Sequence, residues 1–243
     1  MTFDDSNAIG RFIRKLDGLA ALPDRDKAAL KALPLRLKRV PANHMLVREG
    51  DMVNECSILL EGFACRHKDT SGGHRQIVSF HLPGDILDLQ HLWLSRADHN
   101  VETLTAGRIA LIATADLRRL AEERPAIDRA FWRDALIDAS IFREWVLNVG
   151  GRDGKSRIAH MLCEFGARWQ AAGLGSPDRF ELPMTQQVIA EATGMSLVHV
   201  NRMLQELDRS GAIVRDKRVV EIVDWDRMRE IADFDPAYLH AAA

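Results

Sequence analysis

The sequence predicts an α+β protein in which an N-terminal antiparallel β-roll, a form of jelly roll, precedes a long helix and a C-terminal winged helix-turn-helix. Three observations predict this order. Short apolar runs separated by glycine, proline and asparagine fill residues 35–112, as in barrels and sandwiches of short antiparallel strands. An apolar helical pattern begins after Pro125 and continues to about residue 149. Residues 184–209 contain two short amphipathic helical patterns that meet at Gly194.

The composition is typical of a globular protein in water. Of the 243 residues, 47% are hydrophobic and 28% are charged, and the length suffices for one large or two ordinary domains. No apolar run reaches the roughly 18 residues of a transmembrane helix, and the N-terminus does not resemble a signal peptide, so we expect no membrane association. Cys56, Cys65 and Cys163 are odd in number and widely spaced, which favours a cytoplasmic location over a disulfide framework or a zinc ribbon. The net charge of −2 means that any nucleic-acid contact must come from a local basic patch.

The N-terminal part of the chain is expected to fold as one domain, residues 1–124. A helical pattern over residues 7–33 is interrupted at Pro23, which predicts two helices. The Ser71-Gly72-Gly73 turn is a strong hairpin signal inside the strand-rich segment. A short helix over residues 117–123, capped by Thr114 or Asp116, should end this domain. The expected strands lie at residues 35–40, 45–47, 57–60, 63–67, 76–80, 101–104 and 109–112.

The long helix is predicted over residues 125–149 and begins with a proline, which the first helical position tolerates. Asp134 and Asp138 interrupt its apolar seam. Such a seam either lies in the core of its own domain or pairs with its copy across a two-fold axis. The seam residues, which are the candidate dimer contacts, are Ile127, Phe131, Ile137, Ile141 and Trp145.

The glycine-rich segment 150–154 is the clearest domain boundary and the predicted hinge. It is followed by the predicted C-terminal domain, residues 155–243, which opens with a helix from Ser156 to about Ala171.

Residues 184–209 are the most informative segment of the chain. The hydroxyls of Thr185 and Ser196 can cap two helices, and Gly194 suits the sharp turn between them because glycine tolerates a positive φ. Ala190 is small where the two helices must cross. Such a pair fits a helix-turn-helix whose second helix can enter a DNA major groove, and it also fits an ordinary αα-hairpin.

The flanking segments favour the DNA-binding interpretation. Short strands are expected at residues 179–182, 211–214 and 219–223, which would add a β-hairpin to the helix pair. Arg215, Lys217 and Arg218 lie in its turn, where they would contact phosphates as a wing, although a solvated hairpin tip has the same pattern. Helix-turn-helix domains usually bind a palindromic DNA site as two copies. This favours the interpretation in which the long helix pairs with its copy.

Several glycine turns complete a recognisable order of motifs. They are Glu49-Gly50-Asp51, Leu60-Glu61-Gly62 and Pro83-Gly84-Asp85 in the roll, and Ser156-Arg157-Ile158-Ala159 precedes the helix pair. From about residue 10 to 230 the chain resembles the Crp/Fnr family of bacterial transcription regulators. The resemblance implies a cyclic-nucleotide-binding-like jelly roll, a regulator and not an enzyme, a homodimer on a two-fold DNA site, and contact with RNA polymerase.

The effector site departs from this family. Members that bind cyclic AMP carry a Gly-Glu pair and an Arg-Ser pair in the roll, which fall here on Asp88-Leu89 and His99-Asn100. The carboxylate for the ribose and the arginine for the phosphate are therefore missing, and a Thr-Ser pair on the long helix is replaced by Phe142-Arg143. We expect no cyclic AMP at a pocket formed by Asp88, Leu89, His99, Asn100 and Phe142. No cysteine precedes Cys56, so an iron–sulfur cluster is not expected, and the effector is unknown or absent.

The family's base-reading positions fall on Leu197, Val198, Asn201 and Arg202, with His199 beside them. Arg202 matches the family and would contact guanine, or alternatively a phosphate. Leu197 and Val198 replace polar readers, and either touch thymine methyl groups or pack within the protein. The candidate DNA-contacting residues are Thr185, Gln186, Ser196, Leu197, Val198, His199, Asn201, Arg202, Arg215, Lys217 and Arg218.

A second class of function is a cupin-like β-roll that binds a metal or haem through histidines. The candidates are His44, His67, His74, His81, His91 and His99. No H-x-H pair occurs among them, so we assign no metal ligand. Neither the long helix nor the winged helix-turn-helix would be needed by such a protein.

Overall fold

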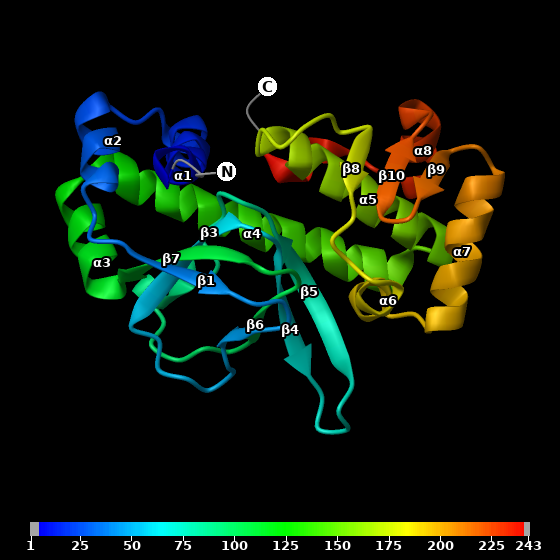
Figure 1. The fold of residues 1–243 in the computed structure, drawn as a ribbon, viewed down its shortest axis with the longest axis horizontal. Coiled ribbons are helices and arrows are strands. Elements are labelled where there is room, and N and C mark those ends of the chain that lie inside the picture. Colours follow the sequence, from blue (N-terminus) through cyan, green and yellow to red (C-terminus); the bar gives the residue numbers. More distant parts are fainter. Residues whose placement is uncertain (1–4, 241–243) are drawn as a thin grey trace. The chain divides into compact units, whose positions relative to one another are not determined.

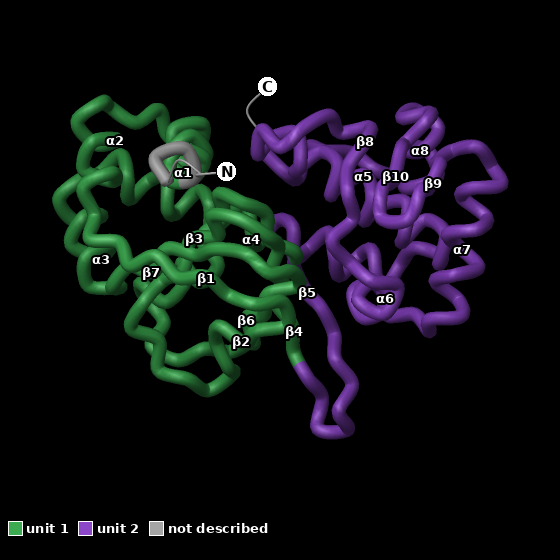
Figure 2. The backbone as a smooth tube through the Cα atoms, in the orientation of Figure 1, with its two compact units in different colours: residues 1–68, 80–139, 242–243 green, residues 69–79, 140–241 purple. Residues whose placement is uncertain are grey.

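The computed structural model describes residues 5–240 as helices and strands in the order that the sequence predicts. The chain divides into two compact units, shown in Figure 2. Of the described residues, the first contains 5–68 and Phe80–Ala139, and the second contains Asp69–Ser79 and 140–240. We describe each unit by itself.

Two antiparallel sheets form the roll, and all of their strands except most of β5 lie largely in the first unit. One sheet has the strand order β1-β7-β3 and the other has the order β2-β6-β4-β5 (Figure 1). Ala110 in the middle of β7 pairs with Leu37 on one side and with Ile58 on the other. The strands are β1 (Arg36–Val40), β2 (Met45–Val47), β3 (Glu55–Glu61), β4 (Ala64–Asp69), β5 (Arg75–His81), β6 (Asn100–Thr103) and β7 (Gly107–Ala113).

Strand β3 separates two apolar clusters because successive side chains point to opposite faces of a sheet. Leu59 packs inside the roll with Val101 and Ile109. Ile58 and Leu60 face the other way, into a cluster formed with the helices. The helical elements of that cluster are α1 (Asp5–Ala20), α2 (Asp24–Lys31), the 3-10 turn η1 (Leu89–Leu92), α3 (Thr114–Glu123) and the first turns of α4 (Pro125–Gly151).

The start of α3 differs from the prediction. Ala113 is the N-cap, and neither Thr114 nor Asp116 provides a capping side chain. Thr114 is the first helical residue, and its hydroxyl donates a hydrogen bond to the carbonyl of Asn54 at 3.2 Å. The Thr114 hydroxyl, which the sequence predicted as a helix cap, instead makes a hydrogen bond to a residue distant in the sequence.

Helix α4 is one continuous helix in Figure 1 and includes Gly150 and Gly151, so the break at the predicted hinge is shorter than expected. Only Arg152 and Asp153 separate α4 from α5 (Gly154–Ala171). The carboxylate of Asp153 caps α5 by accepting a hydrogen bond from the Ser156 amide at 2.9 Å.

The second unit contains the helix pair and its flanking strands. A three-stranded antiparallel sheet with the order β8-β10-β9 lies beside the helices. The C-terminal segment adds a helix and a 3-10 turn that the sequence analysis did not predict. The elements after α5 are β8 (Arg179–Glu181), α6 (Gln186–Thr193), α7 (Leu197–Arg209), β9 (Ile213–Asp216), β10 (Val219–Ile222), α8 (Trp225–Ala232) and η2 (Pro236–Leu239).

Candidate DNA-reading face

The turn between α6 and α7 has the caps that the sequence predicts. The Thr185 hydroxyl accepts a hydrogen bond from the Val188 amide at 3.3 Å, and the Ser196 hydroxyl accepts one from the His199 amide at 3.3 Å. Gly194 ends α6 in the left-handed conformation, with φ 66° and ψ 33°. A side chain there would be strained, since only glycine adopts this conformation without cost. The three predicted positions are confirmed.

Helix α7 has one buried face and one exposed face. Val200, Met203, Leu204 and Leu207 are buried, and α7 packs on α5, α6 and β9. Leu197, Val198, Asn201 and Arg202 are exposed in the first two turns of the helix. Because these four positions share one side of the helix, they form a continuous surface that can contact the edges of bases.

Asn201 is held in place by the preceding helix. Its Oδ1 accepts a hydrogen bond from Nε2 of Gln186 at 2.9 Å. The amide Nδ2 of Asn201 then remains to donate to an acceptor on DNA. Gln186 therefore orients the side chain of Asn201.

His199 lies at the edge of this surface and is half-buried. It packs against the start of α5, where a Cβ added to Gly154 would lie 2.8 Å from Nε2 of His199 and 3.0 Å from Sδ of Met195. The absence of a side chain at Gly154 thus allows α5 and the first turn of α7 to approach closely. The predicted contact of His199 with DNA stays a prediction, and within the protein its imidazole packs against α5.

The predicted wing is the hairpin of β9 and β10, and its three basic residues differ in their surroundings. Arg215 is half-buried and donates hydrogen bonds to Oδ2 of Asp208 on α7, from Nε at 2.9 Å and from Nη2 at 2.6 Å. Lys217 and Arg218 are exposed in the turn between β9 and β10. The predicted contact of Arg215 with phosphate stays a prediction, and within the protein its guanidinium pairs with Asp208.

Most of the five predicted dimer contacts on α4 are covered by the chain itself. Ile127, Phe131, Ile141 and Trp145 are buried within the chain, and Ile137 is half-buried. Ile127 and Phe131 belong to the apolar cluster of the first unit. Four of the five predicted seam residues are thus packed within their own chain, whereas Ile137 keeps a partly exposed side chain. The exposed large apolar residues of α4 are Trp132, Leu136, Val146 and Leu147.

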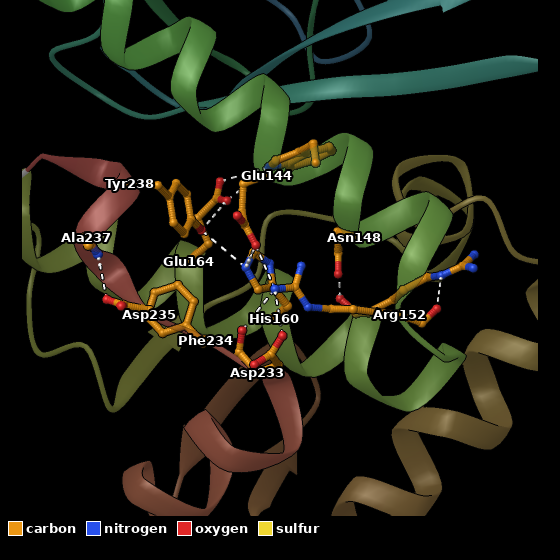
Figure 3. Close-up of polar contacts among 12 residues, drawn as sticks. Glu144, Asn148, Arg152, His160, Glu164, Asp233, Phe234, Asp235, Ala237 and Tyr238 are labelled. Carbon is orange, nitrogen blue, oxygen red and sulfur yellow. Dashed lines mark hydrogen bonds and ion pairs between the residues drawn. The ribbon is translucent and has the colours of Figure 1, made fainter.

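Trp145 instead belongs to a buried polar cluster in the second unit. Its indole Nε1 donates to both carboxylate oxygens of Glu164, at 3.1 and 3.0 Å. Glu164 also accepts a hydrogen bond from the hydroxyl of Tyr238 at 2.8 Å (Figure 3). The last turns of α4, helix α5 and the C-terminal segment are thus joined through one carboxylate.

A second part of the same cluster surrounds Glu144. Its Oε1 accepts a hydrogen bond from Nη2 of Arg152 at 2.7 Å and lies 3.3 Å from Nε2 of His160 (Figure 3). Burial, followed by the charge of Arg152, lowers the pKa of His160 to about 3, so this imidazole is neutral. Sequence analysis missed the cluster. The available signals were weak: a helical histidine and glutamate four residues apart, and the chain's single tyrosine.

Four of the five candidate effector residues belong to the first unit and are buried there. Asp88, Leu89, His99 and Asn100 are buried, and Phe142 is half-buried. Oδ1 of Asp88 accepts a hydrogen bond from the Ser57 amide at 2.8 Å, and Oδ1 of Asn100 accepts one from the Glu49 amide at 2.9 Å. Asp88 and Asn100 thus make hydrogen bonds within the roll, and the role of these residues in binding an effector stays a prediction.

Arg66, which the sequence analysis did not single out, lies in the roll interior on β4. Its guanidinium donates to the carbonyl of Leu87 at 3.0 and 2.6 Å and to the carboxylate of Asp138 on α4. Lys15 on α1 pairs with Asp134 on α4 and with Asp85, each at 2.8 Å. Both carboxylates that interrupted the apolar pattern of α4 are therefore neutralised by cations of the same unit.

We predict that Asp88 makes stability depend on pH. Burial raises the pKa of this carboxyl from 3.8 to about 7, and its Oδ2 has no hydrogen-bond partner within residues 5–240. Between these pKa values the folded protein binds more protons than the unfolded chain, so stability falls as pH rises through this window. Asp88→Asn should remove this dependence and gain stability relative to the native protein by up to about 1.4 kcal/mol per pH unit.

Denaturant unfolding of both proteins from pH 5 to pH 8 measures this difference. Comparing the two proteins separates Asp88 from other titrating groups such as His81, whose pKa burial lowers to about 4. Parallel curves for the two proteins would show that Asp88 is ionised in the fold throughout.

Within residues 5–240, no group of three or more histidine, cysteine, aspartate or glutamate side chains is arranged to hold a metal ion. None of the helices in this part of the chain combines the length and apolar character needed to span a membrane.

Comparison with known proteins identifies relatives over most of the chain. A family profile described as a cyclic nucleotide-binding domain matches residues 37–124, and one described as a Crp-like helix-turn-helix domain matches residues 156–231. The nitrogen fixation regulation protein FixK of Bradyrhizobium diazoefficiens is 30% identical over 184 residues, which are 76% of each protein. The transcriptional activator protein FnrA of Stutzerimonas stutzeri is 24% identical over 200 residues, which are 82% of each protein.

Solved structures show the same fold. FixK2 from Bradyrhizobium japonicum superimposes with a TM-score of 0.76 at 22% identity, covering 82% of this chain and 98% of that one. The predicted succession of β-roll, long helix and winged helix-turn-helix is confirmed. The cupin-like metal or haem protein is not favoured by these similarities.

Proposed function

Because the chain belongs to the Crp/Fnr family of DNA-binding transcription regulators and is not an enzyme, we propose that it binds a palindromic DNA site as a homodimer without a small-molecule effector. The observation that carries this proposal is the exposed face of α7, on which Leu197, Val198, Asn201 and Arg202 lie together opposite the buried stripe. A helix presented in this way fits the major groove.

The proposed dimer contact is the exposed face of α4. Trp132, Leu136 and Val146 are exposed. Together with the exposed Arg143 they follow one another at intervals of four, seven and three residues, which keeps these side chains on one stripe of the helix. Exposed apolar side chains in a row are unusual on the surface of a monomer. Trp93, whose ring packs tilted against that of Trp132 with centroids 4.6 Å apart, extends this surface within the first unit.

We predict that Trp145→Phe lowers stability and leaves the dimer intact. The substitution removes the indole donor to the buried Glu164 carboxylate, at a cost of about 1.5–3 kcal/mol in the free energy of unfolding. Denaturant unfolding and sedimentation velocity measure the two properties on one sample. Trp225→Phe is the matched control, since Trp225 is half-buried at the start of α8, away from α4, and should lose less stability. If the Trp145→Phe protein has unchanged stability but sediments as a monomer, Trp145 is a dimer contact, as the sequence first predicted.

Independence from an effector is supported by the ion pairs that hold α4 within the first unit. Arg66 and Lys15 neutralise Asp138 and Asp134, so α4 is attached to the roll by the chain's own side chains. A ligand can shift a conformational equilibrium only by binding one state better than the other. With this attachment in place, the protein needs no ligand to position α4, and its abundance sets its activity.

Two further parts of the proposal follow the named relatives. Since FnrA is described as a transcriptional activator, we propose RNA polymerase as a partner of the DNA-bound dimer. We also propose a cytoplasmic location, where DNA and polymerase are present and the buried thiols of Cys56, Cys65 and Cys163 stay reduced.

Selection of randomised duplex DNA with the purified protein at near-physiological salt, with no ligand added, tests the proposal. We expect recovery of a palindrome whose half-sites are about one helical turn apart. Enrichment only after addition of cyclic nucleotide or haem would contradict independence from an effector. Failure to enrich any sequence under all these conditions would contradict specific DNA recognition.

A further inference from the structure

Val198 is 80% exposed although its side chain is entirely apolar. It is the second residue of α7, and its neighbour Leu197 is also exposed. The buried residues of α7 already form a complete stripe at Val200, Met203, Leu204 and Leu207. Val198 is therefore not needed for the packing of the helix.

The helical geometry places Val198 in the middle of the exposed face of α7, between Asn201 and Arg202. Successive residues of an α-helix are about 100° apart, so Leu207 lies on the opposite side of α7 from Val198. By the same count, Asn201 and Arg202 flank Val198 on its two sides. The isopropyl group thus points in the direction in which α7 faces the DNA.

An apolar side chain in this position has one complementary feature in the major groove. Thymine alone displays a methyl group there, at C5, whereas the other groups that the bases present are hydrogen-bond donors and acceptors. We propose that Val198 reads the C5-methyl group of a thymine in each half-site. This inference rests on the proposed function, because it requires α7 to lie in the major groove.

The position of this thymine follows from the spacing of the side chains. Residues four apart on a helix are about 5–6 Å from one another, and successive bases on a strand are about 3.4 Å apart. The thymine read by Val198 therefore lies within about two base pairs of the base contacted by Arg202.

Replacement of thymine by deoxyuridine tests the proposal, because it removes only the C5-methyl group. In the selected palindrome, each thymine is replaced in turn, at the symmetric position of both half-sites, and affinity is measured at constant salt. Burial of one methyl group corresponds to about fourfold in affinity per half-site, or about fifteenfold for the symmetric pair. We expect this loss at one thymine position within two base pairs of the Arg202 contact.

Val198→Ala identifies the side chain responsible. Deoxyuridine at the sensitive position should weaken binding of the native protein and leave the affinity of Val198→Ala unchanged, because alanine does not reach the methyl group. Leu197→Ala should retain the native sensitivity. Val223→Ala is the matched control, since Val223 is 57% exposed and follows β10 outside the reading helix.

A third duplex restores the methyl group on a different base. Cytosine at the sensitive position should bind more weakly than thymine, and 5-methylcytosine should recover part of that loss with the native protein only. A native protein that binds its palindrome and is insensitive to deoxyuridine at every thymine would overturn the inference while leaving the proposed function standing. Equal sensitivity in Val198→Ala would assign the methyl contact to another side chain. If no palindrome is selected at all, the proposed function fails and this inference fails with it.

Discussion

Leu136→Asp should convert the protein to a monomer that no longer binds its DNA site tightly. Leu136 is 63% exposed on α4, so the substitution does not disturb the core of the monomer. In a symmetric dimer the two aspartates would be buried near each other without partners, at a cost of about 3–5 kcal/mol each. A monomer engages only one half-site, and specific affinity is then expected to fall by at least about 100-fold.

Sedimentation velocity and a DNA titration on the same preparation measure these two effects. Leu37→Asp is the matched control, since Leu37 is an apolar residue on β1 that is 46% exposed. The control should stay dimeric and retain its affinity. If the Leu136→Asp protein sediments as a folded dimer, the exposed face of α4 does not form the dimer interface.

Arg202→Ala should weaken binding to the specific site by about 1–3 kcal/mol per half-site and relax discrimination at a single base pair. Arg202 is exposed on α7 one turn after Val198, where its guanidinium can donate two hydrogen bonds to O6 and N7 of a guanine. Its loss removes the contact that distinguishes that base pair from the other three.

Competition titrations with sites mutated at each position measure this discrimination. Arg209→Ala serves as the control, because Arg209 is also exposed on α7 but lies in its last turn. If Arg202→Ala weakens all sequences equally and lowers the salt dependence by about one ion, Arg202 contacts a phosphate.

The helix pair could be predicted from sequence because its determinants are local. Thr185, Gly194 and Ser196 act within a few residues of their own position, through capping hydrogen bonds and a left-handed turn. The strands of the roll were predicted nearly to their ends for the same reason. Alternation of side chains and glycine turns specify strands before any tertiary contact is known.

The direction of α4 could not be predicted in this way, because the helix has apolar residues on two faces. Ile127 and Phe131 are covered by helices and strands far away in the sequence, whereas Trp132 and Leu136 are not covered. Periodicity identifies an apolar stripe but not the element that will cover it.

The partners of charged side chains were missed for a related reason. Arg215 has its carboxylate on the preceding helix, and Trp145 finds Glu164 across the α4–α5 turn. Such pairs form only when helices and strands pack together. The sequence therefore showed Arg215 as part of a basic turn and Trp145 as part of an apolar seam, without the carboxylates that they contact.

The mass of the protein–DNA complex on the selected palindrome, measured with no small molecule present, shows whether the protein binds as a dimer without an effector. We expect two chains per duplex at saturation, with dissociation of the complex when Leu136→Asp replaces the native protein. One chain per duplex, or a two-chain complex that forms only after a ligand is added, would contradict this expectation.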